Sequence, residues 1–246
     1  MAPDEVEEVR FALSRPRFND WMMPPVTPGD WQELEGEEAL ATVLSVCRWI
    51  SMNTGEPNLA QEWSIDRVRV RPLACYEDAL LVEFAGYADH SRPGLINVIL
   101  IDEEMVLLDG NSSAFHELNM TWRPKLQTPA GRLDYLLLFM NWVHGDEGRF
   151  HPIGSPEELA ARLDPEAGFR IDPAMLAPMR ELPPPEDATD GTAQFSGTVL
   201  YGDALFVTNM HVYPNGMVEM MDDEPLMAPI PVRPEQLVGP LLVTPV

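Results

Sequence analysis

Basic side chains are scarce in this chain of 246 residues, which has 16 lysines and arginines against 40 aspartates and glutamates and a formal charge of −24. A nucleic-acid-binding protein needs basic surface to displace counterions from phosphates, so this charge argues against direct binding of nucleic acid. Attachment to anionic lipid through a polybasic patch is excluded for the same reason. We therefore expect partners that are neither nucleic acid nor membrane.

Lysine is rarer still, because Lys125 is the one lysine among the 16 basic residues. Lysine codons are AT-rich, so a GC-rich genome is the simplest reason for the preference for arginine. The composition therefore favours a bacterial source.

Cysteines and long apolar runs are also few. The two cysteines, Cys47 and Cys75, cannot make a disulfide framework, and a chain of this length does not need one, so we expect both to be reduced and buried. The first residues have neither the positive nor the apolar region of a signal peptide. No apolar run approaches the ~18 residues that a membrane span requires. These absences predict a soluble, cytoplasmic protein.

Motifs for catalysis and cofactor binding are absent as well. The chain has no Walker or Gly-x-Gly-x-x-Gly loop to hold phosphates, and no Gly-x-Ser-x-Gly turn to present a nucleophile. It also lacks the His-Glu-x-x-His pattern that places two metal ligands on one helix. We expect no cofactor and no resident metal.

The residues that are present can fill a core, since 45% are hydrophobic, including six Trp and nine Phe. Apolar side chains recur at helical spacing over 37–52 and 129–143. Extended apolar segments joined by short polar turns predict antiparallel β-meanders over about 65–109 and 194–222. We predict an α+β fold in which these meanders pack with a central helical segment over about 129–180.

The best candidate boundary is the proline-rich acidic segment 183–191, which is typical of a stiff linker. It divides the chain into an α+β main domain over 1–182 and a small β module over 192–246. The proline-rich tail at 225–246 shows no clear element, and a short helix is expected over 5–13. The small module is short for an independent core, so the alternative is that it completes the first sheet.

One internal similarity joins the two meanders. The segment Tyr76–Val82 matches Tyr201–Val207 at five positions, and both are followed by a strand that ends in aspartate. A duplicated sheet module explains the match, but aspartate-containing turns also resemble one another by chance. Duplication therefore stays one of two explanations.

The densest polar cluster follows the second helix and contains His144, Asp146, Glu147 and His151. Imidazoles and carboxylates can hold a metal ion or divide the acid and base roles of a hydrolase. The alternative is a helix end, at which His144 interacts with the helix dipole and Gly145 caps the last turn. Two glycines make the segment a loop, so the sequence does not define its geometry.

The only local concentration of positive charge is Arg67, Arg69 and Arg71, which alternate along one strand. Their guanidinium groups can bind an anionic group of a ligand or partner through forked hydrogen bonds. The alternative is that they pair across the sheet with carboxylates such as Glu83.

Two hypotheses on function follow. The charge, the lack of a catalytic motif and the apolar tail favour a non-enzymatic, acidic protein that binds a basic protein partner as a regulator, an immunity-like inhibitor or an assembly adaptor. The alternative is a metal-assisted hydrolase that uses the His144–Asp146–Glu147–His151 cluster. A solvated acidic surface also explains the charge without any partner, and the acidic runs are scattered, so the charge by itself does not mark a site.

Overall fold

A computed structural model describes residues 24–53, 63–88, 92–184, 190–238 and 241–243. The chain forms two compact units. Unit 1 consists of residues 1–72, 78–109 and 235–246, and unit 2 consists of residues 73–77 and 110–234. The helix expected over 5–13 lies outside the described residues.

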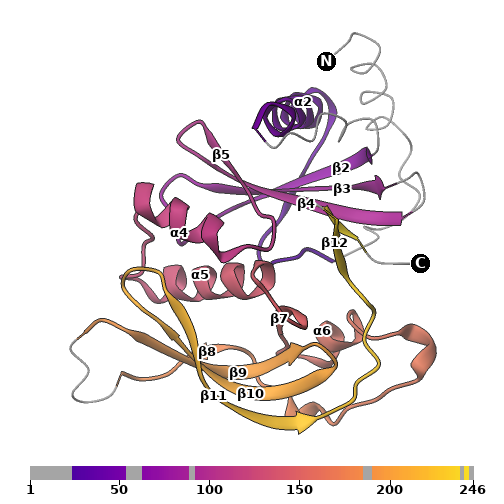
Figure 1. The fold of residues 1–246 in the computed structure, drawn as a ribbon, viewed down its shortest axis with the longest axis vertical. Coiled ribbons are helices and arrows are strands. Elements are labelled where there is room, and N and C mark those ends of the chain that lie inside the picture. The colour runs from indigo at the N-terminus through magenta and orange to yellow at the C-terminus, as the bar shows by residue number, and fades with distance from the viewer. Residues whose placement is uncertain (1–23, 54–62, 89–91, 185–189, 239–240, 244–246) are drawn as a thin grey trace. The chain divides into compact units, whose positions relative to one another are not determined.

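Unit 1 is built on a seven-stranded antiparallel sheet in the order β1-β2-β3-β4-β13-β12, with β5 also paired to β4 (Figure 1). The strands are β1 (Gln32–Leu34), β2 (Trp63–Pro72), β3 (Leu80–Ala88), β4 (Arg92–Ile101), β5 (Glu104–Leu107), β12 (Gln236–Val238) and β13 (Leu241–Val243). The expected meander over 65–109 is therefore confirmed, and its short turns give the antiparallel pairing.

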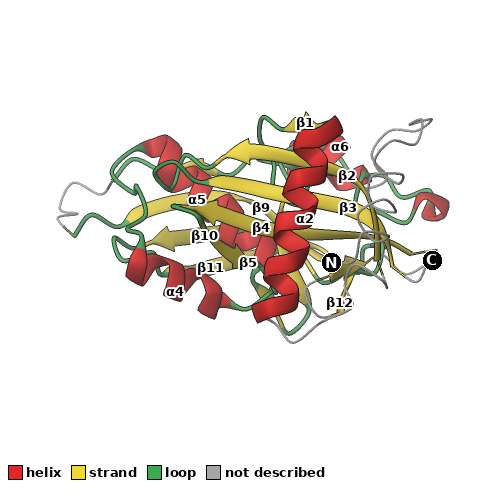
Figure 2. Ribbon diagram, turned by 90° about the horizontal axis from the view of Figure 1, so that it is seen from above, coloured by secondary structure: helices red, strands yellow, loops and turns green. Residues whose placement is uncertain are grey.

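Helix α2 (Gly36–Asn53) covers one face of this sheet, and Figure 2 shows it lying across the strands. Its buried side chains recur every three or four residues, so they form one apolar stripe. The stripe packs against alternate residues of the strands, namely Val68, Val82, Phe84, Ile96 and Val98. Glu37 and Glu38 lie in the first turn, where the helix dipole favours negative charge. The helix predicted over 37–52 is confirmed.

Unit 2 contains a second antiparallel sheet in the order β11-β10-β9-β7-β6, with β8 also paired to β9. Its strands are β6 (His144–Gly145), β7 (Gly148–Pro152), β8 (Arg180–Glu181), β9 (Ala193–Tyr201), β10 (Ala204–Val212) and β11 (Val218–Met227). Its helices are α4 (Ser112–Thr121), α5 (Pro129–Trp142) and α6 (Pro156–Ala160), with short 3-10 turns at Pro165–Ala167 and Pro173–Met175. The two sheets and their helices confirm the predicted α+β class.

Helix α5 forms where the sequence predicts it. The Thr128 hydroxyl accepts a hydrogen bond from the Gly131 amide at 3.1 Å, and Pro129 occupies the first turn, where its missing N–H costs nothing. Tyr135, Leu136, Leu138, Met140 and Trp142 are all buried. A helix with apolar residues nearly all round is buried on most sides, as expected.

Three elements differ from the prediction. Helix α4 forms in a segment for which no element was predicted, and the segment at 144–151 is a β-hairpin instead of a loop. The tail at 225–246 does contain strands, because β11 runs to Met227 and β13 adds to β4 with Leu242 opposite Leu95. Weak local patterns become strands here because distant partners supply the hydrogen bonds.

The sheet of unit 2 continues on both sides of the segment 183–191. Strand β8 pairs with β9, and the Leu182 amide donates to the Gln194 carbonyl at 2.7 Å. Residues 185–189 of the expected linker lie outside the described residues. Of the small module over 192–246, β9, β10 and β11 belong to unit 2, whereas β12 and β13 complete the sheet of unit 1.

The two similar segments both enter a strand through a tight turn. Asp78 has a φ of 50° just before β3, and Gly202 has a φ of 57° between β9 and β10. Short polar turns with a left-handed residue share this chemistry whatever their origin. Internal duplication stays a prediction.

Among the described helices, none combines the length and the apolar character needed to cross a bilayer.

Candidate functional site

Strand β2 carries Arg67, Arg69 and Arg71 on the face opposite to α2. We call these three residues the arginine row. Arg67 makes a forked pair with Glu33 on β1, with its Nε 2.9 Å from Oε1 and its Nη2 3.1 Å from Oε2. Both side chains are partly buried. The guanidinium of Arg67 therefore already binds a carboxylate of the same sheet.

Arg69 lies at the centre of a buried polar row that crosses three strands. It stands opposite Glu83 on β3, which in turn stands opposite Asn97 on β4. The Glu83 side chain is fully buried and accepts from Arg69 Nε at 2.6 Å, from Asn97 Nδ2 at 3.0 Å and from the Val26 amide at 3.0 Å. Burial lowers the pKa of Arg69, whereas the carboxylate of Glu83 counteracts that shift.

A segment from the N-terminal side covers this row within unit 1. The Trp31 ring lies 5.3 Å from the guanidinium carbon of Arg69 and 5.8 Å from that of Arg71, which is cation–π range. The Trp31 indole N–H donates to the Thr27 carbonyl at 2.9 Å and fixes the ring. Gly29 passes so close to the Arg71 side chain that a Cβ there would come within 2.8 Å of it. Arg69 and Arg71 are thus buried side chains, and the cross-strand pairing with Glu83 is the arrangement observed.

The histidine cluster forms the β6–β7 hairpin. Asp146 and Glu147 make its exposed turn, and His144 on β6 and His151 on β7 are half-buried. In the described ranges, no three His, Cys, Asp or Glu side chains lie in an arrangement that could hold a metal ion. The hairpin places His144 and His151 on its two strands and Asp146 and Glu147 in the turn between them, so the four side chains do not form a metal site.

Tyr201 of β9 holds this hairpin in place. Its hydroxyl accepts from the Glu147 amide at 2.9 Å, and its ring stacks on Phe150 with centroids 4.3 Å apart and planes within 5°. Gly145 lies directly against the Tyr201 hydroxyl, so a larger residue would push the ring away. These contacts give the segment a structural role in closing the end of the sheet.

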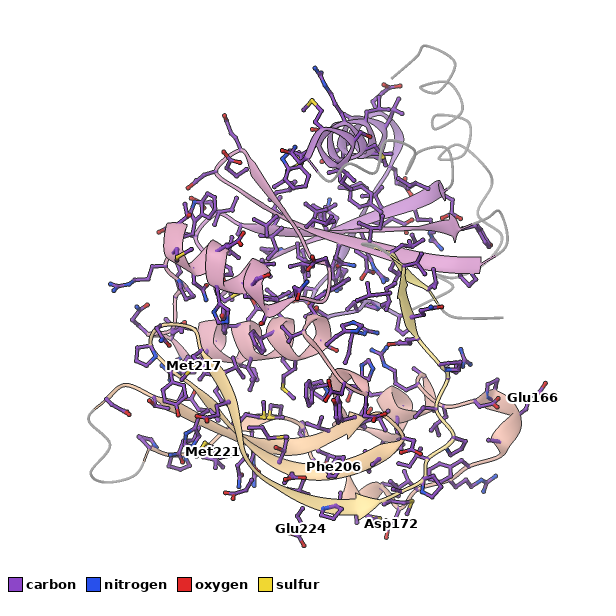
Figure 3. All side chains as sticks on the ribbon, in the orientation of Figure 1. Glu166, Asp172, Phe206, Met217, Met221 and Glu224 are labelled. Atoms are coloured by element: carbon purple, nitrogen blue, oxygen red, sulfur yellow. The ribbon has the colours of Figure 1, made fainter. Side chains whose placement is uncertain are left out.

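The most exposed strand of unit 2 is β11. It is the last strand of its sheet, and within the described residues it pairs with β10 alone. Residues Glu219 to Pro225, which form the middle of this strand, are all exposed. Figure 3 shows Met221 and Glu224 on the strand and Met217 just before it. We call the residues 217–225 the β11 edge.

The β11 edge combines carboxylates with exposed methionines. Met217, Met220 and Met221 are 42%, 44% and 47% exposed. From the pairing register, Asp222 and Glu224 lie on the sheet face of Asn209 and Val207, and Asp223 lies on the other face beside Thr208. The β11 edge thus brings exposed apolar and acidic side chains together on the last strand of its sheet.

The sequence alone did not identify this surface. Its acidic run at 222–224 and the strand before it were visible, but nothing local shows that the strand ends a sheet. The usable signal is the Pro214-Asn215-Gly216 turn, which predicts one hairpin partner for β11.

Comparisons with protein-family models, with curated proteins and with solved structures found no match for this chain.

Proposed function

We propose that this chain is an acidic protein-binding protein that takes a basic, extended segment of a partner protein along the β11 edge. The supporting observation is an exposed edge strand whose middle carries three successive carboxylates between two exposed methionines and a proline. Such a protein would act as a regulator, an inhibitor or an assembly adaptor.

The backbone of β11 supports strand addition. A strand that ends a sheet has one row of N–H and C=O groups facing outward, and an extended peptide can pair with that row. Register shifts at Met221 and Leu226 bend the edge on either side of Asp222–Glu224. These two bulges limit a partner to a short segment of a few residues.

The charge of the β11 edge determines which kind of extended segment can pair with β11. Asp222, Asp223 and Glu224 repel a second copy of this chain, because that copy brings the same carboxylates. Lys or Arg side chains on an incoming strand would lie within a few ångströms of these carboxylates and would be attracted. The overall charge of −24 also steers a basic partner toward the protein during encounter.

The methionines add adaptable apolar contact. A thioether side chain is flexible and polarizable, so it can pack against different partner side chains. Met220 lies on the face of Met210 and Met221 lies at the bulge, which places apolar surface on the same edge as the acidic residues. Carboxylates would then set the charge of the partner, and the methionines would contribute the contact area.

The test uses labelled octapeptides and fluorescence anisotropy with the full chain. A peptide of four Arg-Val repeats should bind, and raising the salt concentration should weaken it, because the carboxylates are exposed. A peptide of four Glu-Val repeats should not bind. A peptide of four Arg-Pro repeats keeps the charge but lacks every second N–H, so it should bind at least about tenfold more weakly if backbone pairing contributes.

A matched pair of variants locates the site. Replacing Asp222, Asp223 and Glu224 by Asn, Asn and Gln should weaken the Arg-Val peptide by about tenfold or more. Replacing the exposed Glu104, Glu117 and Glu166 by Gln makes the same change in net charge elsewhere and should leave affinity within about twofold. Equal losses in both triple variants would show that the whole charge attracts the peptide, and the β11 edge would be rejected as the site.

A further inference from the structure

Unit 2 has a cavity that neither the β11 edge nor the arginine row uses. It has a volume of about 510 Å³ and lies between the C-terminal half of α4, the chain that follows it and the turn that joins β10 to β11. This volume falls in the range that small organic ligands occupy. We call it the α4 pocket.

The polar groups that line the α4 pocket are Arg123, His116, Asn119 and Asn215, and no carboxylate of the described residues lines it. That is unusual in a chain with 40 acidic residues. The carboxamide oxygen of Asn215 accepts from the Met217 amide at 3.0 Å, so its NH₂ group is the part that stays available to a ligand. The oxygen of Asn119 likewise accepts from the Tyr76 hydroxyl at 2.6 Å. The lining therefore offers hydrogen-bond donors.

Arg123 and His116 are both exposed, and neither has an ion pair or hydrogen bond with another residue of the described ranges. This distinguishes Arg123 from Arg67, Arg69 and Arg132, whose guanidinium groups pair with carboxylates of the protein. A guanidinium presents several N–H donors in a plane, which matches the oxygens of a carboxylate or a phosphate. An oxyanion in the pocket would supply the missing acceptor.

Asn119, which lines the pocket, is held in place by two hydrogen bonds that involve its neighbours Tyr135 and Gly216. Asn119 Nδ2 donates to the Tyr135 hydroxyl at 2.8 Å, and that hydroxyl donates to the Gly216 carbonyl at 2.7 Å. Gly216 has a φ of +84° and lies directly against the Asn119 side chain, so no Cβ fits there. This chain of bonds fixes α4 and the β10–β11 turn relative to each other, and a fixed site loses little entropy when a ligand binds.

The remaining walls are apolar. Pro124 and Pro214 are rigid rings, and Met120, which is 81% exposed, can move over a ligand. Proline rings pack well against flat, apolar groups. The pocket thus joins a group of donors to a small apolar surface.

We propose that the α4 pocket binds a small organic anion in which a carboxylate or phosphate group is attached to a flat, apolar body. Arg123 and His116 contact the oxyanion, Asn119 and Asn215 each donate one hydrogen bond, and the two prolines and Met120 enclose the apolar part. The pocket is separate from the β11 edge, so this assignment does not depend on the proposed binding of a protein.

The test is isothermal titration calorimetry of the full chain with four probes at millimolar concentration. Benzoate and phenyl phosphate distinguish the two oxyanions, benzyl alcohol has the ring without the charge, and inorganic phosphate has the charge without the ring. We expect one of the two aromatic anions to bind, and benzyl alcohol and inorganic phosphate to bind at least about tenfold more weakly. Inorganic phosphate that binds as tightly as phenyl phosphate would overturn the apolar part, and no binding by either aromatic anion would overturn the site.

Two arginine variants assign the binding to this pocket. Arg123→Gln should weaken the aromatic anion by about tenfold, because one charge-assisted hydrogen-bonded contact is lost. Arg170→Gln removes another exposed guanidinium from a different loop of unit 2 and should change the affinity by less than about twofold. Both residues are exposed, so both variants should fold, and circular dichroism checks this. Unchanged binding in Arg123→Gln would overturn the proposal.

Discussion

Arg69 and Glu83 stand opposite each other on β2 and β3, and their side chains are 6% and 0% exposed. Asn97 and the Val26 amide occupy the second oxygen of the carboxylate, so no acceptor of Glu83 is left without a donor. A buried ion pair of this kind is stable because each charge is both paired and hydrogen-bonded. The positive charge of Arg69 is thereby neutralised inside unit 1.

Breaking this pair should destabilise unit 1 strongly. Arg69→Met leaves the Glu83 carboxylate buried without its cation, and we expect a loss of about 3–5 kcal/mol in the free energy of unfolding. Arg67→Met breaks a more exposed pair and should cost less than about 1 kcal/mol. Urea unfolding followed by tryptophan fluorescence measures both. The double variant Arg69→Met, Glu83→Leu should recover part of the loss, because the uncompensated carboxylate is gone while the Asn97 and Val26 donors still lack their acceptor. Equal costs for the two single variants would contradict the distinction.

Replacing Gly216 should be costly for two reasons. Gly216→Ala must adopt a positive φ and must also displace Asn119, whereas Gly168→Ala shares a positive φ but has open space around it. We expect Gly168→Ala to cost about 1 kcal/mol, and Gly216→Ala to cost more by about 1–3 kcal/mol. Thermal unfolding of both variants gives the comparison. Similar melting temperatures would mean that the contact with Asn119 relaxes freely.

The hydroxyl of Tyr135 should contribute through its two hydrogen bonds. Tyr135→Phe keeps the ring contacts with Phe115 and Phe139 but leaves the Gly216 carbonyl and one Asn119 donor without their partner. The expected loss is about 1–3 kcal/mol. Tyr213→Phe removes an exposed hydroxyl bonded to Glu219 and should cost much less. The denaturant midpoints of the two variants, compared at equal m-values, measure this difference in stability.

Cys47 gives the protein a pH dependence at alkaline pH. Burial raises the pKa of its thiol to about 11, because the thiolate is disfavoured among apolar residues. A raised pKa means that the unfolded chain loses this proton first, so stability is fully present below the thiol's unfolded pKa and falls as pH rises toward 11. Burial also raises the pKa of the Tyr76 and Tyr135 hydroxyls, so their effect on stability has the same sign as that of Cys47.

The measurement is the free energy of unfolding between pH 8 and 11 for the native chain and for Cys47→Ala. The native chain should lose up to about 3 kcal/mol more than the variant over this range. In the folded protein at pH 8 the Cys47 thiol should also react slowly with a thiol reagent, and it should react fully after unfolding. Identical pH slopes in the two proteins would contradict the assignment to Cys47.

The carboxylates of the β11 edge should also prevent self-association. Replacing Asp222, Asp223 and Glu224 by Thr, Val and Val leaves an apolar strand with an open edge, which is a template for pairing with another copy. We expect dimers or larger species in light scattering after size-exclusion chromatography. The Asn, Asn, Gln variant keeps a polar edge and serves as the control. A monodisperse apolar variant would show that the bulges alone protect the strand.

Much of the fold was predictable from local sequence patterns. Helices α2 and α5 were predicted because their apolar spacing and start signals depend on neighbours within a few residues. The alternation of Arg67, Arg69 and Arg71 placed them on one face, and Glu83 was among the expected partners. Which side of the strand would be covered was not predictable, because Trp31 and Val26 come from a segment far along the chain.

The candidate sites depend on contacts between residues that are far apart in the sequence. The histidine segment was expected to be a loop, and it became a hairpin because Tyr201, 54 residues from Glu147, packs on it. The α4 pocket lies between α4 and the β10–β11 turn, and the hydrogen bond that ties this turn to α5 joins Tyr135 and Gly216 across 81 residues. No local sequence pattern predicts such a pairing, because the hydrogen bond that stabilises it forms only after the chain has folded.

By itself, the sequence determined the α+β class, most of the strands, the two long helices and the strong negative charge. These depend on composition and on contacts between near neighbours, which a single sequence displays. Only the tertiary structure decided that the arginine row is buried against Glu83, that β11 ends its sheet and that four donors surround one cavity. Burial and strand order are properties of the whole set of long-range contacts, so the same carboxylates and guanidinium groups take their roles from which segments come to lie beside them.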